Sequence, residues 1–401
     1  MSTRRAGRRL FLSLGALLLL DLGLSLSAIR DGLFLGRPLP PFGATTHPRQ
    51  RAWLAAERAS RGTKAPPEGT GIFDPELGWT NRPSSRSPNG RETIDALGAR
   101  GPRAYARVKP EGVLRLLCFG DSFTFGAEVA DPEAWPSQLE AIDPRIEAVN
   151  FGVGGYGTDQ ALLRFRREGR DLGADAVLIG FLLENVGRNV NRYRPLYYPA
   201  TAVPAAKPRF VLGGGGLGLL PQPFSTREEF VDAVAEGSVL ARLAEGESWS
   251  SAAPPGPLRF SSVARLAAAG LAYSARQARR LLLDEQGEPF RVTVALLESF
   301  HREARAAGAR EALVLVFPRE EEMNALVRGE DRYWKGLLGA LAARSIPFLD
   351  LSEELAPAHR ASRGGGDAEG VFRAGHLSPT GNRIVARAVF ERVARLLEPP
   401  R

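Results

Sequence analysis

Short runs of consecutive apolar residues alternate with longer segments of helical spacing in the C-terminal part of the chain. The strand-like runs lie at 113–119, 146–149, 176–179, 312–317 and 346–349. The amphipathic helical segments lie at 135–142, 158–171, 292–307, 332–344 and 380–397. Strands that are apolar on both faces and alternate with helices are typical of a parallel sheet covered on both sides. The pattern therefore predicts an α/β fold.

The alternation stops between about 190 and 290. Residues 213–216 are a glycine run, 254–257 are rich in proline, and 259–283 have the pattern of a helical pair or one long helix. We interpret this stretch as an insertion between the third and fourth strands of a domain that spans 111–401.

The N-terminus carries a different pattern. Arg4, Arg5, Arg8 and Arg9 precede an apolar stretch at 10–29, which only Asp21 interrupts with a charge. Roughly 20 apolar residues suffice for one bilayer crossing, and flanking arginines stay on the cytoplasmic side. We predict a membrane-spanning signal anchor at 1–29 in the cell membrane, with the rest of the chain extracytoplasmic. The alternative is a cleaved signal peptide and a secreted protein, because Ser25 and Ser27 allow a cleavage site.

Residues 30–110 are rich in proline, glycine and arginine and contain few periodic apolar runs. They are predicted to form a tether with irregular structure. Within them, 74–79 are expected to be a short ordered piece packed on the main domain.

The amino-acid composition and the charge make several classes of function unexpected. The chain has 401 residues, 44% of them hydrophobic, which is enough for a large core. The net charge of +8 is scattered and not gathered into a basic run with aromatics, so nucleic-acid binding is not expected. The single cysteine, Cys118, excludes an intrachain disulfide, and the four histidines disfavour a histidine-rich metal site. We predict no metal and no cofactor.

The side chains suited to chemistry follow the predicted strands. Ser122 comes soon after the first strand, the glycine-rich stretch 152–157 follows the second, and Asn185 follows the third. His376 lies in a polar, glycine-rich setting near the C-terminus. The carboxyl ends of parallel strands meet at one edge of a sheet. A serine, a histidine and oxyanion donors at that edge are the parts for acyl transfer.

Four sequence blocks carry a resemblance to a known family. They are GDSF at 120–123, NFGVGG at 150–155, the Glu184–Asn185 pair, and GHLSPTGN at 375–382. In these blocks the chain resembles the SGNH (GDSL-type) hydrolases, over about 111–400 apart from 190–290. The resemblance implies a three-layer, flavodoxin-like fold and ester chemistry. It also implies Ser122 as nucleophile, His376 as general base, and an oxyanion hole from the N–H groups of Ser122 and Gly155 with the Asn185 amide.

The chain departs from the family pattern in two places. A one-residue shift in the third block would put Glu184 where the amide donor belongs. In the last block, Arg373 and Ala374 occupy the positions where the family has an aspartate. Three explanations stay open: Asp367 or Glu369 supplies the acid, a backbone carbonyl orients the histidine of a Ser–His dyad, or the site is inactive.

The function predicted from the sequence is an extracytoplasmic serine ester hydrolase or O-acyltransferase. Its substrate would be an acyl ester on an envelope glycan or a lipid. The alternative is a carbohydrate-binding or scaffolding protein that kept the fold and lost the acid. A carboxylate beside Nδ1 of His376 would favour catalysis, whereas Arg373 in that place would favour the alternative. The sequence gives no oligomeric state.

Overall fold

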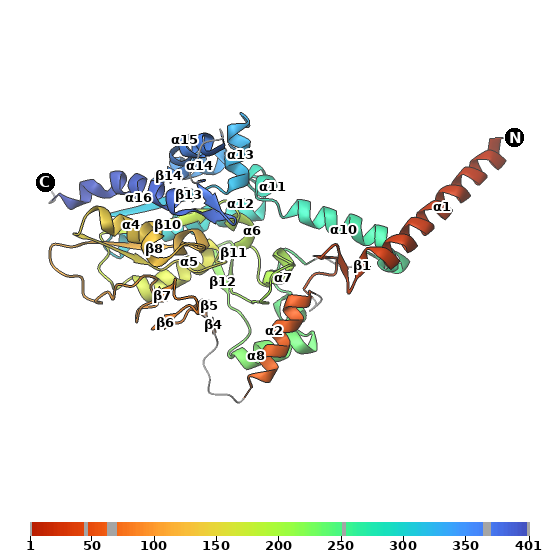
Figure 1. Ribbon diagram of the computed structural model, residues 1–401, viewed down its shortest axis with the longest axis horizontal. Helices are drawn as coiled ribbons and strands as arrows, with labels where there is room; N and C mark the ends of the chain where they lie inside the picture. The colour runs from red at the N-terminus through yellow and green to blue at the C-terminus, as the bar shows by residue number, and fades with distance from the viewer. Residues whose placement is uncertain (1, 44–46, 62–69, 251–253, 364–369, 399–401) are drawn as a thin grey trace. The chain divides into compact units, whose positions relative to one another are not determined.

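The computed structural model describes residues 2–43, 47–61, 70–250, 254–363 and 370–398 (Figure 1). The chain divides into two compact units. The first comprises Met1–Ala65, Asn191–Ala206 and Pro223–Gln277, and the second comprises Pro66–Val190, Lys207–Gln222 and Ala278–Arg401. The domain boundaries predicted at 29/30 and 110/111 stay predictions. The second unit contains the sheet.

The central sheet of the second unit is parallel and has five strands among the described residues. In chain order they are β8 (Leu114–Phe119), β9 (Ile146–Asn150), β10 (Ala176–Leu182), β13 (Glu311–Phe317) and β14 (Phe348–Asp350). Their order across the sheet is β9-β8-β10-β13-β14, and each neighbouring pair is parallel. This is the 2-1-3-4-5 order of a flavodoxin-like sheet, whose ligand crevice lies between the first and third strands. The predicted parallel α/β sheet is confirmed.

Helices cover both faces of this sheet (Figure 1). On one face α4 (Trp135–Ile142), α15 (Leu351–Arg363) and α16 (Pro379–Val393) bury Trp135, Leu355 and Val389 against the strands. The other face is covered by α5 (Thr158–Arg164), its continuation η2 (Phe165–Gly169), and α12 (Glu288–Ala306). There the rings of Phe119, Phe151, Phe165 and Phe300 pack together with centroids 5.0–5.8 Å apart. Apolar side chains on both faces explain why the strands are continuous apolar runs.

Part of the predicted tether is ordered in the second unit as two hairpins. Strands β4 (Gly71–Asp74) and β5 (Gly78–Asn81) form the first, and β6 (Ser85–Arg86) and β7 (Thr93–Ile94) form the second. Asp74 closes the first turn, because its Oδ1 accepts the N–H groups of Glu76 and Leu77 at 2.9 and 2.8 Å. The turn ends at Gly78, whose φ of +88° suits glycine. The expectation of an ordered piece at 74–79 agrees with this hairpin.

The second unit also contains a hairpin and three further helices. The hairpin β11 (Arg209–Gly213) and β12 (Gly216–Leu220) turns at the glycine run. Helices α11 (Ala278–Leu283), α13 (Glu320–Val327) and α14 (Lys335–Ala343) complete the helical layers. In the first unit, the helices are α1 (Ser2–Ser27), α2 (Pro48–Ala59), α7 (Arg194–Tyr197), α8 (Arg227–Glu236), α9 (Val239–Leu243) and α10 (Ser262–Ala275).

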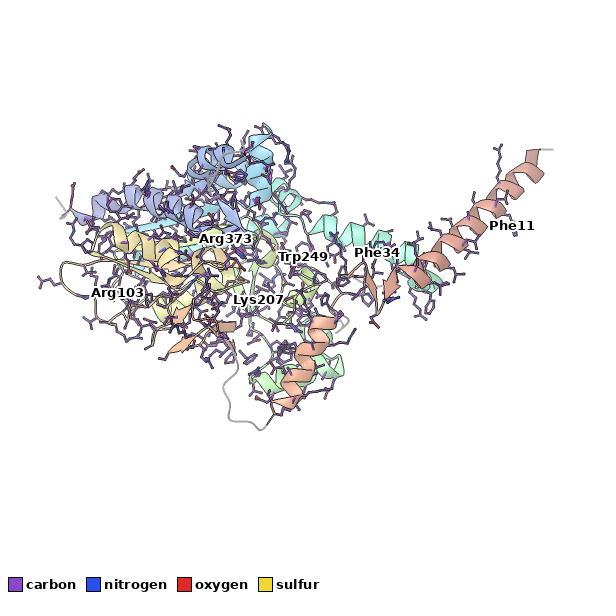
Figure 2. The ribbon with its side chains drawn as sticks, viewed as in Figure 1. Phe11, Phe34, Arg103, Lys207, Trp249 and Arg373 are labelled. Carbon is purple, nitrogen blue, oxygen red and sulfur yellow. The ribbon has the colours of Figure 1, made fainter. Side chains whose placement is uncertain are left out.

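The membrane-spanning helix predicted at the N-terminus gains no support from the structure. The segment does form a helix, α1, on which Phe11 is 77% exposed (Figure 2). In the described part of the chain, however, no helix is both long enough and apolar enough to span a bilayer. Within α1, the carboxylate of Asp21 accepts hydrogen bonds from the Ser261 hydroxyl and the Val263 N–H at 2.8 Å each.

Candidate active site

Ser122 lies at the start of a short helix that directly follows the central strand β8. This helix, α3 (Ser122–Phe125), is capped by Asp121, whose Oδ1 accepts the N–H of Phe123 at 2.9 Å. A Cβ on Gly120 would meet the Thr124 hydroxyl and the Gly180 carbonyl, so the tight exit from β8 requires glycine. The first N–H groups of a helix have no acceptor within it. The backbone N–H of Ser122 is such a group.

His376 is brought to Ser122 by a hairpin of two short strands, β15 (Phe372–Arg373) and β16 (His376–Leu377). The turn between them contains Ala374 and Gly375 at φ +49° and +82°. Nε2 of His376 lies 2.9 Å from Oγ of Ser122, and the imidazole packs on Phe123 with ring centroids 5.4 Å apart. This distance is within the hydrogen-bond reach that a general base requires.

The other ring nitrogen of His376 has no described partner. Nδ1 is buried and makes no hydrogen bond to any residue that the structure describes. Arg373 is paired with His376 across the hairpin, but its side chain is exposed (Figure 2). Asp367 and Glu369, the acids considered from the sequence, lie outside the described residues. The histidine is therefore aligned with the serine, and no described carboxylate takes the place of a triad acid.

Asn185 lies at the end of the neighbouring strand and is oriented by an arginine. It begins α6 (Asn185–Arg188) and is 1% exposed. A guanidinium nitrogen of Arg188 donates to Oδ1 of Asn185 at 3.2 Å. Because a guanidinium can only donate, the oxygen of the amide must face Arg188, which leaves the NH₂ group for another acceptor. Glu184 pairs instead with Arg188 at 3.3 Å and with Arg319 at 3.7 Å, so it does not take the place of the amide.

The glycine-rich loop after β9 is fastened to the turn that carries Ser122. Asn150 accepts the N–H of Gly152 at 3.0 Å and donates to the carbonyl of Phe125 at 3.1 Å. A Cβ on Gly152 would collide with the backbone of Thr124 and Phe125. Gly155 has φ +79°, a conformation that glycine adopts without strain. The loop and the serine turn thus form one packed unit.

Asp121 is buried next to the site, and its charge is balanced by Arg188. Burial raises the pKa of Asp121, and the positive charge of Arg188 opposes that rise. Oδ2 of Asp121 lies 3.1 Å from Arg188, and its other oxygen caps α3. Both oxygens are therefore committed away from Nδ1 of His376, so Asp121 holds the turn and is not the triad acid.

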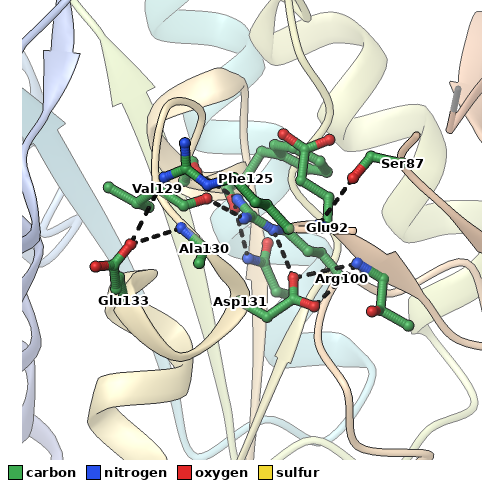
Figure 3. A network of polar contacts seen from close by, with 12 residues as sticks. Ser87, Glu92, Arg100, Phe125, Val129, Ala130, Asp131 and Glu133 are labelled. Atoms are coloured by element: carbon green, nitrogen blue, oxygen red, sulfur yellow. Dashed lines mark hydrogen bonds and ion pairs between the residues drawn. The ribbon is translucent and has the colours of Figure 1, made fainter. Parts of the chain in front are cut away.

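A buried arginine that the sequence analysis did not identify supports the same turn (Figure 3). Arg100 is 2% exposed and donates to the carbonyls of Phe125 at 2.6 Å and Val129 at 2.7 Å. Its Nε donates to Oδ1 of Asp131 at 3.2 Å, and its guanidinium lies 4.5 Å from the Phe125 ring centroid. It lies in the stretch predicted to be a tether, and no motif in that stretch singles it out.

Within the residues described, no cluster of three or more histidine, cysteine, aspartate or glutamate side chains is arranged to hold a metal ion.

Comparison with known proteins gives remote structural likenesses. No family model and no curated protein matches the chain. It is similar to a solved putative lipolytic protein of the G-D-S-L family from Desulfitobacterium hafniense, at 13% identity and TM-score 0.33, covering 69% of this chain and 98% of that one. It is also similar to a lipase/acylhydrolase from Enterococcus faecalis, at 13% identity and TM-score 0.34, covering 72% and 100%.

A third likeness is to a catalytic mutant of an acetylxylan esterase from Geobacillus stearothermophilus. The identity is 14% and the TM-score 0.34, with 72% of this chain and 97% of that one covered. One of these three proteins, the one from Desulfitobacterium hafniense, is named as a member of the G-D-S-L family. The four sequence blocks of this chain resemble the same family. At such low sequence identities and TM-scores, these likenesses say nothing about the chemistry of this chain. Only the geometry of the site bears on that chemistry.

Proposed function

We propose that the protein is a serine ester hydrolase of the SGNH type, with Ser122 as nucleophile and His376 as general base. The observation that carries this proposal is the 2.9 Å contact between Ser122 Oγ and His376 Nε2 at the carboxyl edge of a 2-1-3-4-5 sheet. A nucleophile next to a base, at the switch point of such a sheet, is the arrangement of acyl-transfer enzymes.

The reaction follows from the positions of these atoms. Oγ of Ser122 attacks the ester carbonyl while Nε2 of His376 takes the hydroxyl proton. The tetrahedral intermediate collapses, the C–O bond to the alcohol breaks, and the alkoxide takes that proton from His376. Nε2 of His376 then takes a proton from water as the water oxygen attacks the acyl carbonyl. The C–O bond to Oγ of Ser122 breaks, Oγ takes that proton back, and the carboxylic acid leaves. An alcohol in place of water at that step would give O-acyl transfer.

The negative oxygen of the intermediate needs donors on the side away from His376. The N–H groups of Ser122 and Gly155 and the amide NH₂ of Asn185 supply them in this proposal. They come from the ends of β8, β9 and β10, three neighbouring strands. Loss of one such donor typically lowers kcat by about 10²–10³.

The base acts in a Ser–His dyad in this proposal, because no described carboxylate bonds to Nδ1 of His376. Asp367→Asn and Glu369→Gln test the dyad separately from the nucleophile. A dyad predicts rates within a few-fold of wild type for both variants. Loss of an orienting aspartate in a serine-protease triad costs about 10⁴ in turnover, so a fall of that order would show that one of them is the acid.

The test of the function itself is hydrolysis of p-nitrophenyl acetate by the full chain, compared with Ser122→Ala and His376→Ala. Ser137→Ala on α4 and His301→Ala on α12 are matched controls outside the site. We expect both site variants to lose at least about 10³ of the rate and both controls to retain it. Fluorophosphonate labelling at Ser122, read by mass spectrometry, gives a second readout. A wild type that neither hydrolyses nor labels would support the alternative of a binding or scaffolding protein.

We also propose that the enzyme works outside the cytoplasm on an acylated envelope glycan or lipid. The arginine-flanked, leucine-rich N-terminus supports export, whether or not the segment is later cleaved. Fractionation of expressing cells, with and without residues 2–29, tests this location. Deacylation of isolated envelope material by the wild type, and not by Ser122→Ala, tests the substrate.

A further inference from the structure

We infer that Trp79 is a positioning residue of the oxyanion hole, acting through the peptide group between Gly154 and Gly155. Trp79 lies on β5, at the end of the piece 74–79 that was expected to be ordered within the predicted tether. Its indole Nε1–H donates to the carbonyl of Gly154 at 2.9 Å. The inference rests on the proposed function, because it concerns how one donor of that site is aimed.

The hydrogen bond fixes a carbonyl and thereby an N–H. The carbonyl of Gly154 and the N–H of Gly155 belong to the same planar peptide group. This peptide is trans, so the two bonds point in opposite directions. When Trp79 holds the Gly154 oxygen on its own side, the Gly155 N–H must point to the opposite side. That N–H is the one the proposed mechanism uses.

The residues on both sides of this peptide are glycines, which lack the Cβ that restricts backbone rotation. A Cβ built on Gly154 would meet no atom within 4 Å. Gly155 has φ +79°, a conformation that glycine adopts without strain. A peptide between two glycines rotates about its flanking bonds more readily than one between residues with a Cβ, and the rotated form would turn the donor away from the oxyanion.

Trp79 is itself held firmly enough to direct the loop. The hydroxyl of Tyr156 donates to the Trp79 carbonyl at 2.6 Å, and the two rings pack edge to face with centroids 5.7 Å apart. Two residues along β5, the Asn81 amide donates to the carbonyl of Gly152 at 3.0 Å. Strand β5 therefore holds the glycine loop at two carbonyls, on either side of Val153.

The test replaces only the indole N–H. Trp79→Phe keeps an aromatic ring against Tyr156 and removes the donor. Trp334→Phe is the matched control, because it removes an indole N–H that bonds to Asp350 at 3.1 Å, on the opposite edge strand β14. For p-nitrophenyl acetate we expect Trp79→Phe to lower kcat at least about tenfold with KM within about twofold, a fraction of the loss of a whole donor. Trp334→Phe should keep kcat within about twofold.

Affinity for phenylboronic acid gives a readout that a purely structural role would not move. Its tetrahedral adduct on Ser122 places an oxygen in the oxyanion hole, so its Kd should weaken by the same factor as kcat. The rates and binding capacities are divided by the fraction of protein that fluorophosphonate labels. Misfolded chains, which are not labelled, then do not affect the comparison. Equal kcat and equal boronate affinity for Trp79→Phe and Trp334→Phe would overturn the inference. Failure of the proposed function is a separate outcome: the wild type would then neither hydrolyse the ester nor be labelled, or Ser122→Ala would hydrolyse the ester as fast as wild type.

Discussion

The guanidinium of Arg188 lies 3.1 Å from the carboxylate of Asp121, the residue directly before Ser122. The same nitrogen donates to the carbonyl of Tyr156 at 3.1 Å and to Oδ1 of Asn185 at 3.2 Å. One side chain therefore connects the three loops that follow β8, β9 and β10. Each of these loops supplies one donor to the proposed oxyanion hole, so the relative placement of the donors depends on Arg188.

Replacing Arg188 by methionine should lower kcat more than it raises KM. Without the guanidinium, Oδ1 of Asn185 loses its hydrogen-bond donor. The amide can then turn so that its oxygen, in place of its NH₂ group, faces the intermediate. The buried Asp121 also loses its charged partner. We expect kcat for p-nitrophenyl acetate to fall about 10²-fold, near the loss of a single oxyanion donor. Steady-state kinetics of the full chain measure this split.

Arg188→Lys separates charge from geometry. A lysine keeps the positive charge for Asp121, but its single ammonium replaces a planar guanidinium that contacts Asp121, Tyr156 and Asn185 through one nitrogen and Glu184 through another. Its kcat should fall between those of wild type and Arg188→Met. Arg332→Met is the matched control, since Arg332 pairs with Asp350 at 3.0 Å on strand β14, two strands from β10. An effect on kcat as large in the control as in Arg188→Met would contradict the special role of Arg188.

Gly152→Ala should disrupt the site, whereas Gly154→Ala should be tolerated sterically. The new methyl at 152 would lie 2.7 Å from the Thr124 carbonyl carbon and the Phe125 Cα, which are backbone atoms of the nucleophile turn. At 154 the methyl meets nothing within 4 Å. We expect Gly152→Ala to lower both kcat and the urea midpoint, with an overpacking cost of about 1–3 kcal/mol. Equal activity of the two variants would show that the turn can move without harm.

The sheet was predictable because its strands are buried on both faces. Runs such as 113–119 and 312–317 contain few polar residues, so their type and approximate ends could be deduced from the sequence alone. Strand order follows less directly. The 2-1-3-4-5 order depends on which strands the helices of each crossover connect, and this became evident only in the structure.

The site was predictable where backbone chemistry leaves a mark in the sequence. Glycines at 120 and 152 are needed because no Cβ fits there, and they flag the two loops. Arg100, Arg188 and Trp79 could not be recognised, because each acts through carbonyls or carboxylates far away in the chain. Hydrogen bonds to main-chain oxygens leave no pattern in a single sequence. His359 is a further example, because it is 4% exposed and its Nε2 lies 2.9 Å from Oδ1 of Asn324, far away in the chain.

Arg100→Met should destabilise the second unit strongly. The guanidinium is buried with Asp131 and satisfies three backbone carbonyls, those of Phe125, Gly126 and Val129. Removing one partner of a buried ion pair typically costs about 3–5 kcal/mol, because the other charge stays buried. Urea unfolding of wild type and variant measures this loss. Arg145→Met is the control, since Arg145 pairs with Asp143 on the surface, and its urea midpoint should stay close to that of wild type.

The contribution of Glu303 to stability should depend on pH. Burial alone would raise the pKa of this carboxyl, but hydrogen bonds from Arg166 and Ser299 outweigh burial and lower it. A lowered carboxyl pKa stabilises the fold above the unfolded pKa of about 4.3, and this stability is lost as the pH falls through the folded pKa. Glu303→Gln should therefore cost about 1 kcal/mol at pH 7, because the arginines are partly exposed and screened.

Below about pH 4 the difference between Glu303→Gln and wild type should shrink, since the native carboxyl also becomes neutral there. Urea midpoints at both pH values measure it. Glu298→Gln on the same helix is the control, because Glu298 pairs with Arg344 at 3.3 Å with both side chains more than 40% exposed. A Glu303→Gln deficit that stays constant down to low pH would mean that the side chain acts through packing between α12 and η2, and its charge would then contribute nothing.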